Sequence, residues 1–473
     1  MSNNPGVTIK GGLADWQIVQ QHDGKADLVL EGVWSWASAV REPAVWARVV
    51  DEETGLTVLP WTTLATTLDG SFHGTLRNVP AGGLYRVETT LMFAELEDDI
   101  QWGGRGDMRH HVGVGDVYLI AGQSNATGYA KDAVADPLEL GVHLFRASGQ
   151  WTLASHPFND GTGSVFGANL ESGNPAHSPY LCFAKRVKKS AGYPIGLVAG
   201  ALGGSPLSGW NPEENGVLYR NLLAMAKAQG AGGVRGLLWY QGCADASPAL
   251  CDSYLGRFTR FVQALRRDLG QPDLPLFTVQ LNRLVTGAPT PEEDRAWGVL
   301  REAQRQAARQ IPNVYVIPST DGRLSDFVHN NASSNLAIGE RLARQAARHF
   351  HGGKLPCFAP DIERATKVAD DKIELSFANV TGTLHLFERD IRYGRTPVSA
   401  RYRPFAVQDA QGDNEVREWR VSARSRIVLT TARPLAANAK VHGASEVNPS
   451  DYIPNDPDSQ LPMLSFHGVA VSR

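Results

Sequence analysis

A short apolar run that ends at a polar turn constrains this chain more than any other feature. Val117–Ala121 is apolar and rich in β-branched residues, as a buried strand would be. Gly122 ends the run, and Gln123, Ser124 and Asn125 follow at once. A serine between a strand and a helix lies at the crevice where open α/β sheets bind ligands. The turn therefore predicts either a nucleophilic Ser124 or a polar helix cap.

Strand-like and helical patterns alternate from residue 109 to residue 354. The alternation predicts a parallel sheet with helices on both faces, and a nucleophile after the first strand favours a flavodoxin-like strand order. Three segments with apolar residues at helical spacing are Tyr254–Leu269, Pro291–Ile311 and Ala337–Phe350. The predicted strands are Val117–Ala121, Val142–Phe145, Ile195–Ala199, Gly236–Tyr240, Leu276–Gln280 and Val314–Ile317.

The two flanks of this region have a different character. Residues 1–108 contain short strand patterns separated by Gly and Pro turns, which predicts a β-sandwich domain. Residues 355–473 begin with a proline-bearing linker and return to strand patterns, which predicts a second β-rich domain. Five tryptophans of the first flank either fill its core, which we favour, or form a sugar-stacking face: Trp16, Trp34, Trp36, Trp46 and Trp61.

Composition excludes several classes of function. The net charge of −3 creates no field that would gather nucleic acid, and no run of 18 apolar residues predicts a membrane span. The segment Met1–Pro5 lacks the features of a secretory signal, so we expect a cytoplasmic protein, or a periplasmic or secreted one if a leader was removed. Four cysteines are too few for a disulfide scaffold, although Cys243 and Cys251 are close enough to pair. No Cys/His cluster has zinc-ligand spacing, so no metal is expected.

Two further polar segments follow predicted strands. Gly203 and Gly204 come after the Ile195–Ala199 strand, where paired glycines let the backbone approach a ligand and offer an N–H to an anion. Gln241 comes directly after Gly236–Tyr240 and either aims its amide at the same crevice or bonds its own turn. Each segment alone is a weak signal.

A fourth segment follows the last predicted strand. Asp326 and His329 are three residues apart, so the carboxylate can bond one imidazole nitrogen while the other faces outward. A histidine oriented in this way is a suitable base for a serine hydroxyl. The segment therefore predicts an acid–base pair that acts on Ser124.

Together these segments resemble the SGNH hydrolases, and more closely the sialate O-acetylesterase group and related carbohydrate acetylesterases. The resemblance rests on Gly122–Asn125, Gly203–Pro206 with Trp210, Trp239–Gly242 and Asp326–His329, in that order across residues 109–353. It implies that Ser124 is the nucleophile, His329 the general base and Asp326 the orienting carboxylate. It also implies an oxyanion hole made by the N–H groups of Ser124 and Gly204 (or Gly203) and the side-chain amide of Gln241. No cofactor is implied.

The resemblance leaves several questions open. Members often have Asp-x-His where this chain has Asp-x-x-His, so Asp321 or a backbone carbonyl could replace Asp326. Cys243 stands where members commonly have an acidic residue, and Asp245 is the nearest substitute. Cys243 as the nucleophile would need an adjacent base, which the sequence does not supply.

The implied substrate is an acetylated sugar. The resemblance favours 9-O-acetylated sialic acid, with acetylated xylan or xyloglucan oligosaccharides as the alternative. An anionic sugar invites an arginine clamp, for which Arg220, Arg235 and Arg323 are the candidates. The rival interpretations are a non-catalytic glycan-binding protein and a short-chain lipid esterase or thioesterase, which would need an apolar acyl groove.

Overall fold

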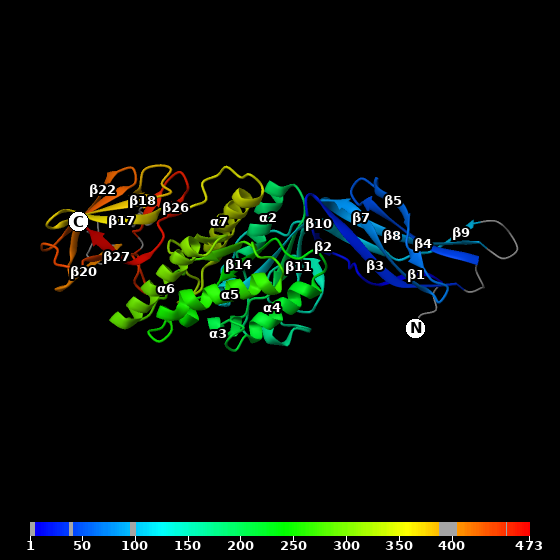
Figure 1. The fold of residues 1–473 in the computed structure, drawn as a ribbon, viewed down its shortest axis with the longest axis horizontal. Helices are drawn as coiled ribbons and strands as arrows, with labels where there is room; N and C mark the ends of the chain where they lie inside the picture. The colour runs from blue at the N-terminus through cyan, green and yellow to red at the C-terminus, as the bar shows by residue number, and fades with distance from the viewer. Residues whose placement is uncertain (1–4, 37–40, 95–100, 387–403, 451) are drawn as a thin grey trace.

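Three regions follow one another along the long axis of the molecule in the computed structural model (Figure 1). The structure describes residues 5–36, 41–94, 101–386, 404–450 and 452–473. Strands of the N-terminal region lie at one end, an α/β domain lies in the middle, and strands of the C-terminal region lie at the other end. None of the described helices is long and apolar enough to cross a membrane.

The N-terminal region consists of two sheets around a shared core. In β3, buried and exposed side chains alternate from Lys25 to Glu31, so one face of the strand is covered. Leu28 and Leu30 of β3 and Val45 and Val49 of β4 are fully buried in the same cluster. The strands are β1 (Gly6–Gly11), β3 (Lys25–Ser35), β7 (Ser71–Pro80) and β6 (Ala65–Thr66) in one sheet, with β4 (Arg41–Asp51), β5 (Thr57–Thr63), β8 (Gly82–Ala94) and β9 (Gln101–Gly104) in the other.

One long strand joins this region to the α/β domain. The strand β10 (Met108–Gly122) pairs antiparallel with β8 through its first half and parallel with the short β2 (Ile18–Gln20). From Asp116 onward it lies between two parallel neighbours at the centre of the next sheet. The predicted strand Val117–Ala121 is thus the second half of a continuous element that begins in the preceding domain.

The central sheet has the order β12-β11-β13-β10-β14-β15-β16. Its strands run parallel except β12, which forms a hairpin with β11. The predicted parallel α/β sheet and its β-rich flanks are confirmed, but the β11–β12 hairpin extends the sheet beyond a plain flavodoxin-like arrangement. The bounds are β11 (Val142–Phe145), β12 (Trp151–Leu153), β13 (Ile195–Ala199), β14 (Gly236–Tyr240), β15 (Leu276–Val279) and β16 (Val314–Ile317).

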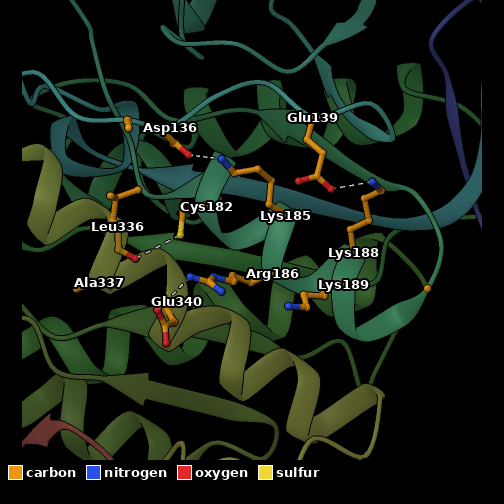
Figure 2. Close-up of a pocket in the computed structure, with 12 residues that line it drawn as sticks. Asp136, Glu139, Cys182, Lys185, Arg186, Lys188, Lys189, Leu336, Ala337 and Glu340 are labelled. Atoms are coloured by element: carbon orange, nitrogen blue, oxygen red, sulfur yellow. Dashed lines mark hydrogen bonds and ion pairs between the residues drawn. The ribbon is translucent and has the colours of Figure 1, made fainter.

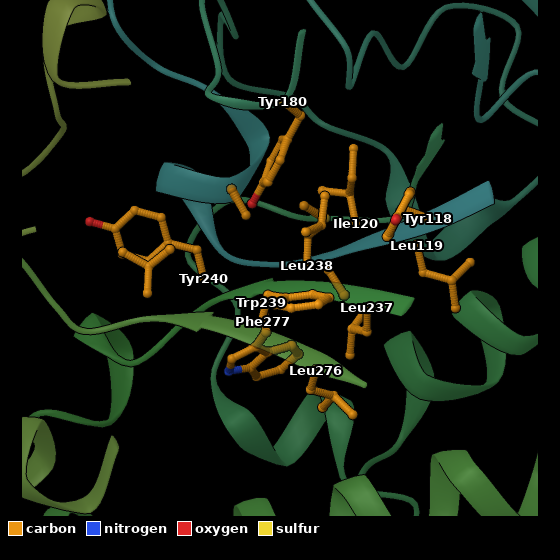
Figure 3. Close-up of a cluster of buried hydrophobic side chains, with 14 of the residues drawn as sticks. Tyr118, Leu119, Ile120, Tyr180, Leu237, Leu238, Trp239, Tyr240, Leu276 and Phe277 are labelled. Carbon is orange, nitrogen blue, oxygen red and sulfur yellow. The ribbon is translucent and has the colours of Figure 1, made fainter. Parts of the chain in front are cut away.

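The central strands of this sheet, which are β13, β10 from Asp116 onward, β14 and β15, are buried along their length, as parallel strands covered by helices must be. Figure 3 shows their apolar side chains stacked with Tyr180, the first residue of α2. The helix α6 begins at a capping box of Thr290 and Glu293 with Pro291 in its first turn. The helices are α1 (Ser124–Thr127), α2 (Tyr180–Ala191), α3 (Leu207–Trp210), α4 (Val217–Ala228), α5 (Tyr254–Asp268), α6 (Pro291–Gln310) and α7 (Ala332–Phe350).

The C-terminal region docks on α6. Arg305 Nη1 lies 2.8 Å from Asp361 Oδ1, and Arg309 Nη2 lies 2.6 Å from Asp361 Oδ2. Its larger sheet has the order β21-β20-β24-β27-β17-β18-β23-β22. The bounds are β17 (Asp361–Ala369), β18 (Lys372–Ala378), β20 (Phe405–Asp409), β21 (Gly412–Asp413), β22 (Val416–Ala423), β23 (Arg426–Thr431), β24 (Lys440–Gly443) and β27 (Phe466–Ser472), with β19 (His385–Leu386), β25 (Pro454–Asp456) and β26 (Leu461–Pro462) in a separate small sheet.

Four of the five tryptophans named in the sequence analysis have different surroundings in the structure. Trp16 packs against the core of the α/β domain, and the centroid of its ring lies 4.0 Å from that of the His111 ring. Trp34 and Trp36 pack on the core of the N-terminal sheets. Trp61 is 37% exposed beneath the guanidinium of Arg48.

Candidate active site

The turn after β10 presents Ser124 at the carboxyl edge of the sheet. Gly122 adopts a φ of +132°, and a Cβ at this position would lie 2.2 Å from the carbonyl oxygen of Tyr240, so a side chain is excluded. Ser124 then opens α1 and is 9% exposed. Among the described residues no acceptor bonds its N–H, as expected for the first turn of a helix.

The preceding residue locks this turn onto the end of β14. The side-chain oxygen of Gln123 accepts hydrogen bonds from the N–H groups of Gly242 at 2.9 Å and Ala244 at 3.3 Å. Its own N–H donates to the carbonyl of Tyr240 at 3.0 Å. The serine turn that follows β10 is therefore held against the end of β14 and the residues after it.

The loop after β16 holds His329 by its ring and by its backbone. Asp326 Oδ2 lies 2.6 Å from His329 Nδ1, and Asp326 Oδ1 accepts the N–H groups of Val328 and His329 at 2.8 Å. Burial raises the pKa of the Asp326 carboxyl, but these hydrogen bonds outweigh it and lower that pKa. Within the described part of the chain, His329 Nε2 has no hydrogen-bond partner.

The second candidate for the carboxylate has another partner. Asp321 is 9% exposed and forms a two-pronged ion pair with Arg341 of α7, at 2.6 and 2.5 Å. Only Asp326 of these two carboxylates bonds the imidazole.

Asn125 brings the histidine loop to the serine turn. Its Nδ2 donates to the carbonyl of Val328 at 3.2 Å, and its Oδ1 accepts the N–H of Asn330 at 3.0 Å. The residue next to Ser124 thus binds the backbone on both sides of His329. Two segments that are about 200 residues apart in sequence are thereby fixed against each other.

The two glycines after β13, Gly203 and Gly204, differ in the hydrogen bonding of their N–H groups. The Gly203 N–H donates to Glu171 Oε2 at 2.8 Å and is therefore engaged. Gly204 is exposed in a left-handed conformation with φ +67°, and its N–H meets no acceptor among the described residues. The Leu202 N–H bonds the carbonyl of Gly122, which fixes this loop beside the serine turn.

Gln241 does not have the geometry that we expected of an oxyanion donor. It is fully buried, and its Nε2 donates to Asp245 Oδ2 at 2.6 Å and to the carbonyl of Ser205 at 3.3 Å. An amide nitrogen has two hydrogens, so both are engaged. Asp245 also accepts Arg257 Nη1 at 2.9 Å and is itself buried. Gln241 and Asp245 therefore hold the loops around the site together.

The cysteines give no support to a thiol nucleophile. All four are free, so Cys243 and Cys251 do not form a disulfide. Desolvation raises the pKa of the Cys243 thiol to about 12. A thiol with this pKa is almost wholly protonated near neutral pH and is a poor nucleophile.

The structure adds two residues that the sequence did not suggest, one beside the histidine and one bonded to the first. The ring of Tyr129 stacks on that of His329, with centroids 4.8 Å apart and planes 19° apart. The Tyr129 hydroxyl donates to Glu171 Oε1 at 2.7 Å. No local pattern marks either residue, because their significance arises from contacts between distant loops.

Another Asp–His cluster has side chains at metal-binding distances. The candidate ligand atoms of Asp136, His156 and His177 lie within 4.8 Å of one another. However, Asp136 also pairs with the Lys185 ammonium, and His156 Nδ1 accepts the Ser178 N–H. A neutral His156 therefore carries its proton on Nε2, which donates to Asp136 and cannot bind a metal. We interpret the cluster as a hydrogen-bond network and assign no metal to it.

A pocket of about 880 Å³ borders this cluster between α2 and α7 (Figure 2). Its charges are largely matched: Lys188 Nζ lies 2.7 Å from Glu139, and Arg186 Nη2 lies 3.7 Å from Glu340. Ser124 and His329 do not line it.

Comparison with known proteins supports one family. Residues 114–348 match the model of the carbohydrate esterase, sialic acid-specific acetylesterase family. A probable carbohydrate esterase of Arabidopsis thaliana is 25% identical over 258 residues, which cover 50% of this chain and 91% of that protein. The crystal structure of a carbohydrate acetylesterase from Xanthomonas citri covers 97% of this chain and 98% of its own, with 23% identity and a TM-score of 0.63. The fold of the whole chain, β-rich flanks included, therefore recurs in that structure.

Proposed function

This chain belongs, through residues 114–348, to the sialic acid-specific acetylesterase family of carbohydrate esterases, and we propose that its Ser124, His329 and Asp326 remove O-acetyl groups from a carbohydrate. The chain is a carboxylic ester hydrolase. The observation that carries the residue assignment is a pair of hydrogen bonds at Asn125, which donates to Val328 and accepts from Asn330. They hold the backbone around His329 against the turn that bears Ser124.

The proposed reaction has two halves. His329 Nε2 takes the Ser124 proton as the hydroxyl oxygen attacks the acetyl carbonyl, and Asp326 steadies the imidazolium through Nδ1. The tetrahedral intermediate expels the sugar alcohol, which receives the proton from His329. Water, deprotonated by the same imidazole, then attacks the acetyl-enzyme and releases acetate.

We assign the developing oxyanion to two backbone N–H groups. The N–H groups of Ser124 and Gly204 lack acceptors among the described residues, which supports them as donors. Removing one oxyanion-hole donor typically costs about 2.7–4 kcal/mol of transition-state stabilisation. In this proposal Gln241 is a positioning residue, since both hydrogens of its amide are engaged.

For the sugar, we favour a neutral acetylated oligosaccharide over 9-O-acetylated sialic acid. Of the three candidate arginines, Arg235 lies away from the serine turn. Arg235 precedes β14, at the opposite end of the strand from Gln241, and faces Asp116 at 3.6 Å. Arg220 lies in α4 and donates to the carbonyl of Asn215. Arg323 alone belongs to the histidine loop.

A negative charge beside the loop of Gly203 and Gly204 also supports a neutral sugar. The Glu171 carboxylate bonds the Gly203 N–H, next to the proposed oxyanion donor. The carboxylate of a sialic acid would be repelled by Glu171 if it bound beside this loop, unless a cation were paired with it. A neutral sugar meets no such penalty.

Acetate release from acetylated xylo-oligosaccharides, O-acetylated sialic acid and 4-nitrophenyl acetate tests both parts of the proposal. We expect Ser124→Ala to lose activity on every substrate, while Ser190→Ala, a surface serine of α2, keeps it. A Ser124→Ala protein that retains the wild-type rate refutes the mechanism. If O-acetylated sialic acid is the only sugar that releases acetate, and Arg323→Ala abolishes that release, the neutral substrate is refuted and the mechanism remains intact.

A further inference from the structure

The Glu171 carboxylate touches both halves of the proposed catalytic apparatus. One oxygen accepts the Tyr129 hydroxyl at 2.7 Å and the Gly173 N–H at 2.9 Å. The other accepts the Gly203 N–H at 2.8 Å. Tyr129 stacks on His329, and Gly203 precedes the proposed oxyanion donor Gly204. We propose that Glu171 is a positioning residue that sets the imidazole and the oxyanion loop relative to each other.

The packing around this carboxylate leaves little freedom. A Cβ on Gly203 would lie 2.9 Å from Glu171 Oε2 and 3.2 Å from the Tyr129 hydroxyl. A Cβ on Gly173 would lie 1.9 Å from the same hydroxyl. The two glycines thus allow the backbone of both loops to lie directly against Tyr129 and Glu171.

Tyr129 remains a donor in this arrangement. Burial, together with its hydrogen bond to Glu171, raises the pKa of the phenol well above its usual value. A protonated hydroxyl bonded to a carboxylate makes a charge-assisted hydrogen bond, which is stronger than one between neutral groups. Tyr129 also contacts the His329 ring. Asp326 bonds the edge of that ring at Nδ1, and Tyr129 stacks on its face.

The geometry explains how one residue that need not touch substrate can affect the chemistry. His329 must meet the Ser124 proton while the Gly204 N–H meets the developing oxyanion, and both conditions apply in the same transition state. A displacement of about 1 Å in such a constellation can cost about 100-fold in rate. Loss of Glu171 frees Tyr129 and Gly203 together, so its effect should fall on kcat rather than on KM.

This inference rests on the proposed function and is tested with variants of the full chain on 4-nitrophenyl acetate. We expect Glu171→Ala to lower kcat by about 10- to 100-fold with KM within about twofold. Glu171→Gln, which keeps one good acceptor oxygen, should show a smaller loss. Tyr129→Phe should lose less than Tyr129→Leu, because phenylalanine retains the stacked ring.

The matched control is another tyrosine–carboxylate bond in the same domain. Tyr219 donates to Asp268 Oδ2 at 2.6 Å, far in sequence from the catalytic segments, so Asp268→Asn should leave kcat within about twofold. A double-mutant cycle between Tyr129→Phe and Glu171→Gln should show non-additive losses in kcat. Thermal unfolding of each variant identifies any loss that merely reflects unfolded protein.

The outcomes separate this inference from the proposed function. A wild-type kcat in folded Glu171→Ala and Glu171→Gln overturns the positioning role while an inactive Ser124→Ala preserves the mechanism. A change in KM without a change in kcat would also overturn the positioning role of Glu171. An active Ser124→Ala protein would overturn the mechanism whatever the Glu171 variants do.

Discussion

Two Asp–His clusters in the α/β domain use the same side chains in different ways. Asp326 bonds a single histidine in an exposed loop, with 41% of its side chain accessible, and leaves His329 Nε2 open. Asp136 has 4% of its side chain accessible and is shared by His156 at 3.3 Å and His177 at 3.1 Å, together with Lys185. The difference teaches that a carboxylate points to a catalytic base only where the second imidazole nitrogen is accessible as well as unpaired, because His177 Nδ1 also lacks a hydrogen-bond partner among the described residues but is buried.

Substituting one histidine from each cluster should give the largest contrast. We expect His329→Ala to lower kcat/KM by about 10³-fold or more, since general base catalysis and the serine act as a unit. His156→Ala should leave kcat/KM within about fivefold, because its ring nitrogens face Asp136 and Ser178. The kcat/KM of both variants on 4-nitrophenyl acetate tests this contrast. Equal losses of kcat/KM in the two variants would show that the two clusters do not differ in catalysis.

The carboxylates of the histidine loop offer the next contrast. Asp326→Asn should lower kcat by about 100-fold, because the imidazole loses the group that fixes its tautomer. Asp321→Asn should instead lower stability, since it leaves Arg341 buried without its partner. Steady-state kinetics and urea unfolding of both variants measure the two effects. A catalytic loss in Asp321→Asn at full stability would give the triad role to Asp321.

Asp136 should contribute to stability and little to catalysis. Burial raises the pKa of its carboxyl, but hydrogen bonds from His156, His177 and Lys185 outweigh it and hold that pKa well below the usual range. We expect Asp136→Asn to lower the free energy of unfolding by about 3 kcal/mol at pH 7.

The pH dependence follows from the sign of that shift. A carboxyl whose folded pKa is lowered contributes stability above its unfolded pKa of about 3.9, and this contribution is lost as the pH falls further. The difference in unfolding free energy between wild type and Asp136→Asn should therefore shrink below about pH 4. A difference that grows toward low pH would contradict this account of the cluster.

The smallest effect is expected at Cys243. Cys243→Ser should keep kcat within about twofold, because burial raises the pKa of the thiol to about 12 and the group is not needed as a nucleophile. Iodoacetamide at pH 7.5 should leave activity unchanged. Inactivation that Cys243→Ser prevents would restore the thiol as a candidate.

Local patterns predicted the parallel strands well. Ile195–Ala199 and Gly236–Tyr240 have the predicted bounds, because buried parallel strands are short continuous apolar runs. The helix α7 begins at Ala332 rather than at the predicted Ala337, since its first turn is polar and is capped by Asn331. Polar first turns carry no apolar periodicity, so the pattern misses them.

The site was predictable only in part. Ser124 follows the end of β10, and His329 lies in the polar loop between β16 and α7, so local patterns mark both positions. Asn125, Tyr129 and Glu171 act through contacts between loops that are far apart in the chain, and no local signal encodes such contacts. Gln241 shows the converse, since its position after β14 suggested a ligand contact while its amide serves Asp245 and Ser205.

Covalent labelling by a fluorophosphonate probe, mapped by mass spectrometry, tests the central claim most directly. We expect a single adduct on Ser124, formed at least about 100-fold more slowly in His329→Ala and at the wild-type rate in His156→Ala. An adduct on another residue, or equal labelling of Ser124 in wild type and His329→Ala, would contradict it.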